Sequence, residues 1–162
     1  KMKKYPISTA VSLIMTLDEH QKKHEGEPVT LVFNSPEIDF MSSMGIFDTL
    51  RAYSQFMDLR IEVRFPIDFM QLAACCGLDK SRVYISKSAF IVFCKPRFST
   101  YGTMTDAKIT VKAFQAMLRR NCEVLSVSFN EDTDEVEEWV NEGKIIESDD
   151  LKELGYKILG EV

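Results

Sequence analysis

The sequence predicts a single α/β domain, residues 1–162, with a largely parallel sheet. Short apolar, β-rich runs alternate with segments of helical periodicity, and the connections between them are short. Strands that are joined through helices in this way run parallel to one another. No composition break, internal repeat or low-complexity stretch divides the 162 residues, which favours one domain.

Periodicity and turn residues place the elements along the chain. Apolar residues at every third or fourth position indicate helices, and alternation or short β-branched runs indicate strands. Glycine, proline and polar turn residues separate them. In order, we expect a helix over Ile7–His24, strand Val29–Phe33, helix Met41–Phe56, strand Leu59–Phe65, helix Phe69–Cys76, strands Val83–Ile85 and Phe90–Phe93, a long helix Thr105–Phe129, helix Thr133–Glu142, and a short helix from Ser148 to Gly155.

Several polar residues have expected local roles. Asp132 and Glu135 have the spacing of a capping box for the helix Thr133–Glu142, and Ser148 is expected to cap the last helix. The basic residues near the start, including Lys4, are expected to be solvated. The acidic run Glu131–Glu142 fits a solvated helix face, although it could also bind a basic partner.

The long helix Thr105–Phe129 is predicted to need two partners. One apolar stripe keeps helical spacing from end to end, which suits packing on the domain's own core. A second apolar set lies on another side and predicts an interface with another molecule. Its members are Ile109, Ala113, Ala116, Val124 and Val127.

Composition argues against several classes of function. The net charge of −5 gives no reason to bind nucleic acid or anionic membranes. No apolar stretch approaches the roughly 20 residues needed to cross a bilayer. The cysteines form no CxxC motif and have no histidine at ligand spacing, so we expect neither a metal nor another cofactor. We expect the four cysteines to be reduced thiols used in packing, and we see no signal peptide. Both expectations favour a reducing compartment such as the cytoplasm.

Motifs in order along the chain resemble the ClpP peptidase family. Asn34-Ser35-Pro36 and then Met44–Leu50 are similar to the family's strand–turn–helix segment, and the spacing from Asn34 to Asp48 matches that of the family without a gap. Gly102–Asp106 resembles the entry to its long handle helix, and Glu147–Gly155 resembles its closing segment. The resemblance implies a ClpP/crotonase-like spiral of ββα units, without the family's amino-terminal strand and axial loop. It also implies self-assembly into stacked rings through the handle helix, with an active homologue or an AAA+ ATPase as further partners.

The family's Ser-His-Asp triad is not matched at the corresponding positions. The nucleophile position falls at Asp68 or its neighbours, and no Ser or Thr occurs between Ser54 and Ser81. Cys94 stands where the family has its histidine, and Trp139 stands near its aspartate. The chain's two histidines, His20 and His24, are expected on the outer side of the sheet. A hydroxyl nucleophile needs an adjacent base, so proteolysis is not expected.

The oxyanion loop of the family is also altered. Glu37 and Ile38 replace the paired glycines that follow the Asn-Ser-Pro turn. Glycine allows positive φ and close approach to a substrate, whereas Ile38 disfavours this backbone geometry and Glu37 adds an anion. The sequence therefore predicts a non-proteolytic ClpP-like subunit with a structural or regulatory role.

Two alternatives stay open at this stage. The first is a monomeric adaptor or regulator that binds another protein through the former active-site cleft. The second is a residual enzyme, using Cys75, Cys76 or Cys94 as a thiol nucleophile, or Asp68 with Glu37 or Asp39 as a crotonase-like acid/base pair. Against the second, the cysteine pair fits buried helix packing, and Asp68 fits a solvated loop or a salt bridge to Arg64.

Overall fold

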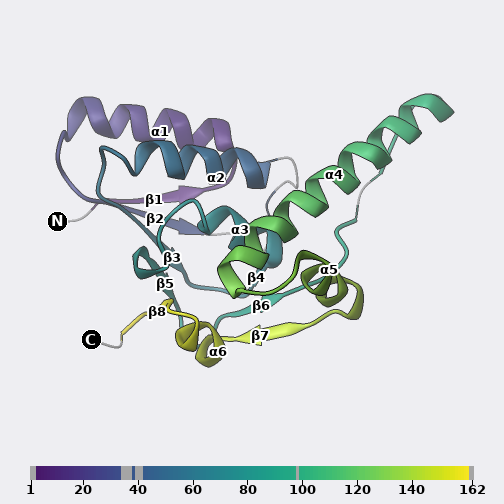
Figure 1. The fold of residues 1–162 in the computed structure, drawn as a ribbon. Helices are drawn as coiled ribbons and strands as arrows, with labels where there is room; N and C mark the ends of the chain where they lie inside the picture. The colour runs from purple at the N-terminus through teal and green to yellow at the C-terminus, as the bar shows by residue number, and fades with distance from the viewer. Residues whose placement is uncertain (1–2, 34–37, 39–41, 98, 161–162) are drawn as a thin grey trace.

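A computed structural model describes residues 3–33, 38, 42–97 and 99–160 of the chain (Figure 1). It confirms the α/β class: helices and strands alternate along the chain, and most strand pairs are parallel. The elements are β1 (Lys3–Ile7), α1 (Ala10–Lys23), β2 (Val29–Phe33), α2 (Ser42–Tyr53), β3 (Leu59–Val63), β4 (Ile67–Asp68), α3 (Phe69–Cys75), a 3-10 turn η1 (Lys80–Arg82), β5 (Val83–Ile85), β6 (Phe90–Val92), α4 (Met104–Phe129), α5 (Thr133–Glu142), β7 (Ile145–Glu147), α6 (Ser148–Glu153) and β8 (Lys157–Ile158).

The main sheet has five parallel strands in the order β1-β2-β3-β5-β8. Alternate residues such as Leu31, Ile61 and Val83 point to one face and are fully buried. Helices α1 and α2 cover this face and contribute Leu17 and Leu50 to the same core (Figure 1). Burying this many aliphatic side chains, at roughly 25 cal/mol per Å² of apolar surface, is the main source of the fold's stability.

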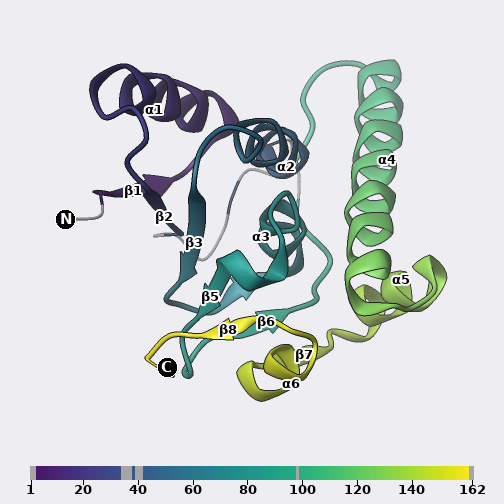
Figure 2. The same ribbon diagram turned by 60° about the vertical axis from the view of Figure 1, so that its left-hand side comes forward.

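A smaller sheet, β4-β6-β7, lies beside the main sheet and joins the end of β3 to the C-terminal helices. Strand β4 runs parallel to β6, and β6 runs antiparallel to β7. Figure 2 shows this sheet next to α6 and below the C-terminal end of α4. It brings together chain segments near residues 68, 92 and 146, which are distant in the sequence.

Helix α4 projects away from the rest of the domain (Figures 1 and 2). It begins with a capping box in which Thr103 and Asp106 satisfy each other's backbone N–H groups. It ends at Asn130, which adopts the left-handed conformation with φ 57°. Its buried residues all belong to its last three turns, between Asn121 and Phe129. Leu118 is partly buried against the core, and most of α4 before it is exposed. The stripe expected to pack on the core from end to end is therefore corrected: Val111, one of its members, is exposed.

Most predicted elements are present, but several boundaries are corrected. The first helix begins at Ala10 rather than Ile7, because Thr9 and Ser12 form a capping box and the preceding residues pair with β2 as β1. Strand β1 was not predicted, nor were the short strands β4, β7 and β8. The strand predicted over Leu59–Phe65 ends at Val63.

One predicted cap is wrong, and another is confirmed only in part. Asp132 caps α5 by accepting from the N–H of Asp134, whereas Glu135 accepts a hydrogen bond from Trp139 Nε1 at 3.0 Å and forms no capping box. Glu147 is the N-cap of α6. Ser148 is instead the first helical residue, and its hydroxyl donates to the Lys87 carbonyl at 2.9 Å. The Glu135 carboxylate is bonded to Trp139 and the Ser148 hydroxyl is bonded to Lys87, so neither side chain makes the capping bond that the local pattern predicted.

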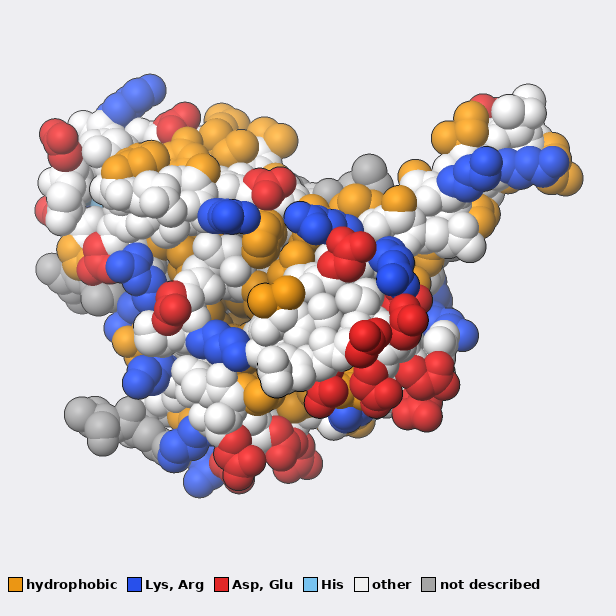
Figure 3. Space-filling view, in the orientation of Figure 1, with side chains coloured by type: hydrophobic (Ala, Val, Ile, Leu, Met, Phe, Trp, Pro, Cys, Tyr) orange, Lys and Arg blue, Asp and Glu red, His pale blue; other side chains and the backbone are white. Residues whose placement is uncertain are grey.

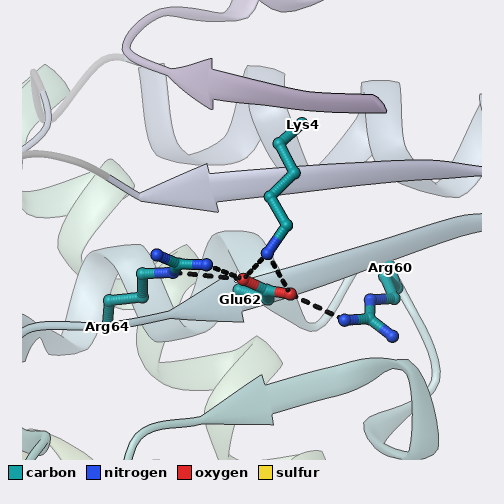
Figure 4. Close-up of polar contacts among 4 residues, drawn as sticks. All are labelled: Lys4, Arg60, Glu62 and Arg64. Carbon is teal, nitrogen blue, oxygen red and sulfur yellow. Dashed lines mark hydrogen bonds and ion pairs between the residues drawn. The ribbon is translucent and has the colours of Figure 1, made fainter. Parts of the chain in front are cut away.

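The second face of the main sheet is polar and is organised around Glu62 in β3 (Figure 4). The Glu62 carboxylate is buried and accepts hydrogen bonds from Lys4, Arg60 and Arg64 at 2.6–3.1 Å. Lys4 reaches it from β1, across the intervening strand β2. The Arg60 guanidinium also lies 4.5 Å from the centre of the Tyr84 ring on β5. The expectation that Lys4 is merely solvated is therefore wrong.

The charge of Glu62 depends on these three cations. Burial alone would raise the pKa of Glu62, but hydrogen bonds from Lys4, Arg64 and Arg60 outweigh burial and lower the pKa to about 2. The folded-state pKa is thus lower than the ordinary value of 4.5. The stabilisation from ionised Glu62 is fully present above the ordinary pKa and is lost as the pH falls from there through about 2.

Replacing this carboxylate tests the arrangement. Glu62→Gln keeps the shape but leaves three cations without a counter-charge, so the free energy of unfolding at neutral pH should fall by about 1–3 kcal/mol. Urea denaturation should show the gap to the wild type narrowing as the pH is lowered below the ordinary pKa of 4.5. Glu142→Gln, at an exposed position of α5, is the matched control and should be nearly neutral. A gap that does not change with pH would contradict an ionised Glu62.

Candidate functional site

Three segments that the ClpP resemblance links to catalysis lie side by side in the structure. Asp68, the last residue of β4, pairs in register with Val92 of β6, two residues before Cys94. The Phe93 N–H donates to the Lys144 carbonyl at 2.8 Å. The Phe93 ring lies 5.5 Å from the Trp139 ring of α5, centre to centre. The small sheet and α5 therefore bring the Asp68, Cys94 and Trp139 segments to one place.

Asp68 acts as the N-cap of α3. Its carboxylate accepts a hydrogen bond from the Gln71 backbone N–H at 2.8 Å, and the Gln71 side chain accepts from the Asp68 N–H at 3.1 Å. This capping box satisfies two backbone donors at the start of a helix whose residues are all buried. The alternative prediction of a salt bridge between Asp68 and Arg64 is wrong, because Arg64 pairs with Glu62 instead.

Trp139 belongs to an aromatic cluster, which we define as Phe69, Phe93, Phe129 and Trp139. Ring centres in this cluster lie 5.4–6.1 Å apart. These distances are typical of stacked and edge-to-face pairs. The Lys144 ammonium lies 3.4 Å from the centre of the Trp139 ring, and Glu135 accepts from the indole N–H. Trp139 is thus a packing residue that joins α5 to α4 and to the end of β6, and Phe69 extends the cluster to α3 through Phe93.

The cysteines differ in their surroundings. Cys75 and Cys122 are buried, Cys76 is half-buried and Cys94 is exposed. Burial raises the pKa of the Cys75 and Cys76 thiols, and it raises that of Cys122 to about 12. A thiol with a raised pKa holds little thiolate at neutral pH and is a poor nucleophile. The expectation of packing thiols therefore fits Cys75 and Cys122, but not Cys94.

Both histidines lie on the edge of the main sheet formed by β1. His20 of α1 is buried and hydrogen-bonded through Nδ1 to the Tyr5 hydroxyl at 3.1 Å and through Nε2 to the Glu27 carbonyl at 3.2 Å. The His24 ring lies 5.2 Å from that of His20. Asp68 and Cys94 belong to the region of the smaller sheet, so these imidazoles act in packing around α1.

The altered oxyanion loop falls largely outside the described residues. The predicted site residues that lie outside the described residues are Asn34-Ser35-Pro36, Glu37 and Asp39. Ile38 is described, and it is buried as part of the hydrophobic core.

The predicted interface residues lie on the side of α4 that the domain leaves uncovered. Ile109 is 61% exposed and Val127 is 84% exposed, while Ala113 and Ala116 are also exposed. Val124 is half-buried because it packs against the core. Apolar side chains are visible along the projecting arm in Figure 3. An apolar surface of this kind on a projecting helix is typical of an interaction site.

Val124 and Val127 also line a hollow of about 470 Å³ at the base of α4. The opposite wall comes from Phe47 of α2 and Leu78 after α3, and Lys80 lies at its margin. Lys80 donates to the Ser128 and Leu154 carbonyls, and so satisfies the C-terminal ends of α4 and α6. Sequence reasoning missed this hollow, because Phe47 and Leu78 reach α4 only through the packing of α2 and α3.

With this geometry established, the sequence can be compared with known families. Residues 3–158 match the model of the Clp protease family, described as Clp protease. The match spans nearly the whole chain, and the protein therefore belongs to the Clp protease family. The predicted ClpP-like α/β fold is confirmed. A search of curated proteins found no match.

In the part of the chain that the structure describes, no group of three or more His, Cys, Asp and Glu side chains is placed to hold a metal ion. None of the helices in the same residues is both long and apolar enough to cross a membrane.

The role of Asp68 can be tested by substitution. Asp68→Ala should lower the free energy of unfolding by about 1 kcal/mol, because the α3 backbone loses its cap. Asp68→Ser and Asp68→Asn, which retain a capping oxygen, should stay close to the wild type in urea denaturation. If all three variants lost the same stability, the capping role would be wrong.

Proposed function

We propose that this protein is a non-proteolytic subunit of the Clp protease family that assembles through α4, with copies of itself or with a homologous subunit. The observation that carries the proposal is the exposed apolar side of α4 on a helix that projects from the domain. Family membership supports the proposal, because resemblance to this family implies assembly through a long helix.

The contacts of α4 support its use as an assembly surface. Within α4 the buried residues begin at Asn121, and Leu118 packs partly buried on the core, so packing within the chain does not account for exposed apolar residues such as Ile109. Ile109, Ala113 and Ala116 recur at intervals of four and three residues, and therefore share one side of the helix. Small side chains there allow a partner helix to approach closely. The hollow beside Val127 extends the same apolar surface to α2.

Three contacts support the absence of proteolysis. Asp68 is engaged as a helix cap, and Trp139 is held inside the aromatic cluster. His20 is buried beside Tyr5 on another part of the fold. Serine-type hydrolysis needs a hydroxyl, an imidazole within hydrogen-bond reach and an orienting carboxylate. The side chains at these positions stabilise the fold instead.

Assembly through α4 is tested by the double variant Ala113→Arg/Ala116→Arg. Both positions are exposed and arginine is a good helix former, so the monomer should stay folded. Two buried guanidinium groups would oppose assembly, and light scattering should show a shift to monomer. Gln115→Arg, at an exposed position on another side of the same helix, is the control and should leave the assembly intact. A wild type that is monomeric, alone and with a homologue, would contradict the proposal.

Absence of proteolysis is tested with purified protein. A fluorophosphonate probe should leave it unlabelled, and fluorogenic peptides should remain uncleaved under conditions in which an active ClpP cleaves them. Peptide cleavage that disappears in Asp68→Ala, while the fold is retained, would overturn the proposal. Acyl thioesters and iodoacetamide extend the assay to residual thiol chemistry, with Cys75→Ala/Cys76→Ala/Cys94→Ala as the comparison.

A further inference from the structure

The hollow at the base of α4 has the size and lining of a small-molecule site. Its volume of about 470 Å³ lies within the roughly 300–1,000 Å³ typical of ligand pockets. Most of its wall is apolar, and this part of the wall comes from α2, the end of α3 and α4: Phe47, Cys76, Leu78, Val124 and Val127. Figure 3 shows this face, with hydrophobic side chains gathered between α2 and the base of α4. The described part of the chain therefore leaves an apolar space open to a ligand.

Close packing of α2 against α3 fixes two walls of the hollow. Gly77 lies where the two helices meet, and a Cβ atom at this position would clash with the Phe47 carbonyl oxygen and with the Leu50 Cβ. The two helices are thus already in contact and cannot move closer. Leu78 belongs to the buried core, and Val124 of the facing wall packs against that core. The hollow is therefore preformed, which spares a ligand the cost of ordering the site.

Lys80 places a positive charge at the margin of the hollow. Its ammonium group donates to the Ser128 carbonyl, in the last turn of α4, and to the Leu154 carbonyl at the end of α6. An ammonium has three N–H donors, so one remains after these two bonds. Within the part of the chain that the structure describes, no ion pair includes Lys80. The hollow therefore holds an anchored cation that can accept an anionic partner.

The other charged groups around the hollow have contacts of their own. Arg120 and Glu123 form an ion pair with 3.1 Å between their nearest polar atoms. The Asp79 carboxylate accepts hydrogen bonds from the backbone N–H and the hydroxyl of Ser81. These contacts hold both carboxylates in place, whereas the Lys80 ammonium keeps a donor. A ligand with one negatively charged acceptor group suits this arrangement.

We propose that the hollow binds a small amphipathic acid, with its hydrocarbon chain against Phe47, Leu78 and Val124 and its carboxylate on Lys80. Burial of the chain supplies most of the affinity, and the charged hydrogen bond fixes the orientation. A free acid fits better than the C-terminus of a peptide, because a peptide backbone brings polar groups that apolar walls cannot satisfy. The inference goes beyond the proposed function and does not depend on it, although Val124 and Val127 belong to both the hollow and the predicted interface.

Titration calorimetry with sodium octanoate tests the site. Octanoate should bind the wild type saturably, with a dissociation constant of about 1 mM or below, as expected for about ten non-hydrogen atoms. Hexanoate should bind about tenfold more weakly, because two buried methylene groups are lost. The absence of saturable octanoate binding, or equal binding of the two acids, would overturn the inference.

Two variants test the charge. Lys80→Met should weaken octanoate binding by about tenfold and leave 1-octanol binding nearly unchanged, since only the acid uses the ammonium charge. Val127 is exposed, so Val127→Glu should fold like the wild type, and its carboxylate should also weaken octanoate binding. Ile109→Glu, at an exposed position earlier in α4, is the control and should bind octanoate normally. If circular dichroism shows that Lys80→Met is unfolded, Val127→Glu decides the question. Octanoate binding that no folded hollow variant weakens would overturn the inference.

The assembly variant separates this inference from the proposed function. Ala113→Arg/Ala116→Arg keeps the hollow and should bind octanoate like the wild type. Loss of binding in that variant would contradict a site within one chain. Tighter binding of N-acetyl-leucyl-leucine than of octanoate would assign the hollow to a protein C-terminus and overturn the inference. A wild type that binds octanoate but is monomeric, alone and with a homologue, would contradict the proposed function while supporting the ligand site.

Discussion

The buried carboxylate of Glu62 is the constraint on which the main sheet depends. It lies on the middle strand of five, and Lys4 reaches it from the first strand by crossing β2. A charge in this position is tolerable only because three cations donate to it. Their aliphatic stems cover the sheet while their charged ends converge on Glu62. The same arrangement therefore seals a sheet face that no helix needs to cover, and fixes the positions of exposed positive charge.

The region of Asp68, Cys94 and Trp139 separates what backbone pairing determines from what the side chains determine. The small sheet still brings these segments together, because strand pairing between β4 and β6 depends on the backbone. The side chains are engaged in capping and in aromatic packing. A carboxylate is a good N-cap, and a large aromatic ring fills an internal space well. Asp68 and Trp139 both stabilise the frame of the fold in this way.

Helix α4 connects the domain with the assembly that we propose. Its last turns belong to the core through Cys122, Leu125 and Phe129, which anchors the helix firmly. The rest extends outward and carries apolar residues such as Ile109 that its own chain does not cover. An anchored helix presents this surface at a fixed angle, so little conformational entropy is lost when a partner packs on it.

The sequence by itself determined the α/β class and the bounds of α3 and α5 within a residue, because periodicity is a local property. It did not show where along α4 the core contact begins, since Val111 is exposed and the buried residues start at Asn121. It also excluded a serine at the Asp68 position, which is a matter of residue identity. Only the tertiary structure decided that Lys4 binds Glu62, that β1, β4, β7 and β8 are strands, and that Ser148 bonds Lys87 instead of capping a helix. Short strands and buried ion pairs depend on partners remote in the chain, and local pattern carries no record of them.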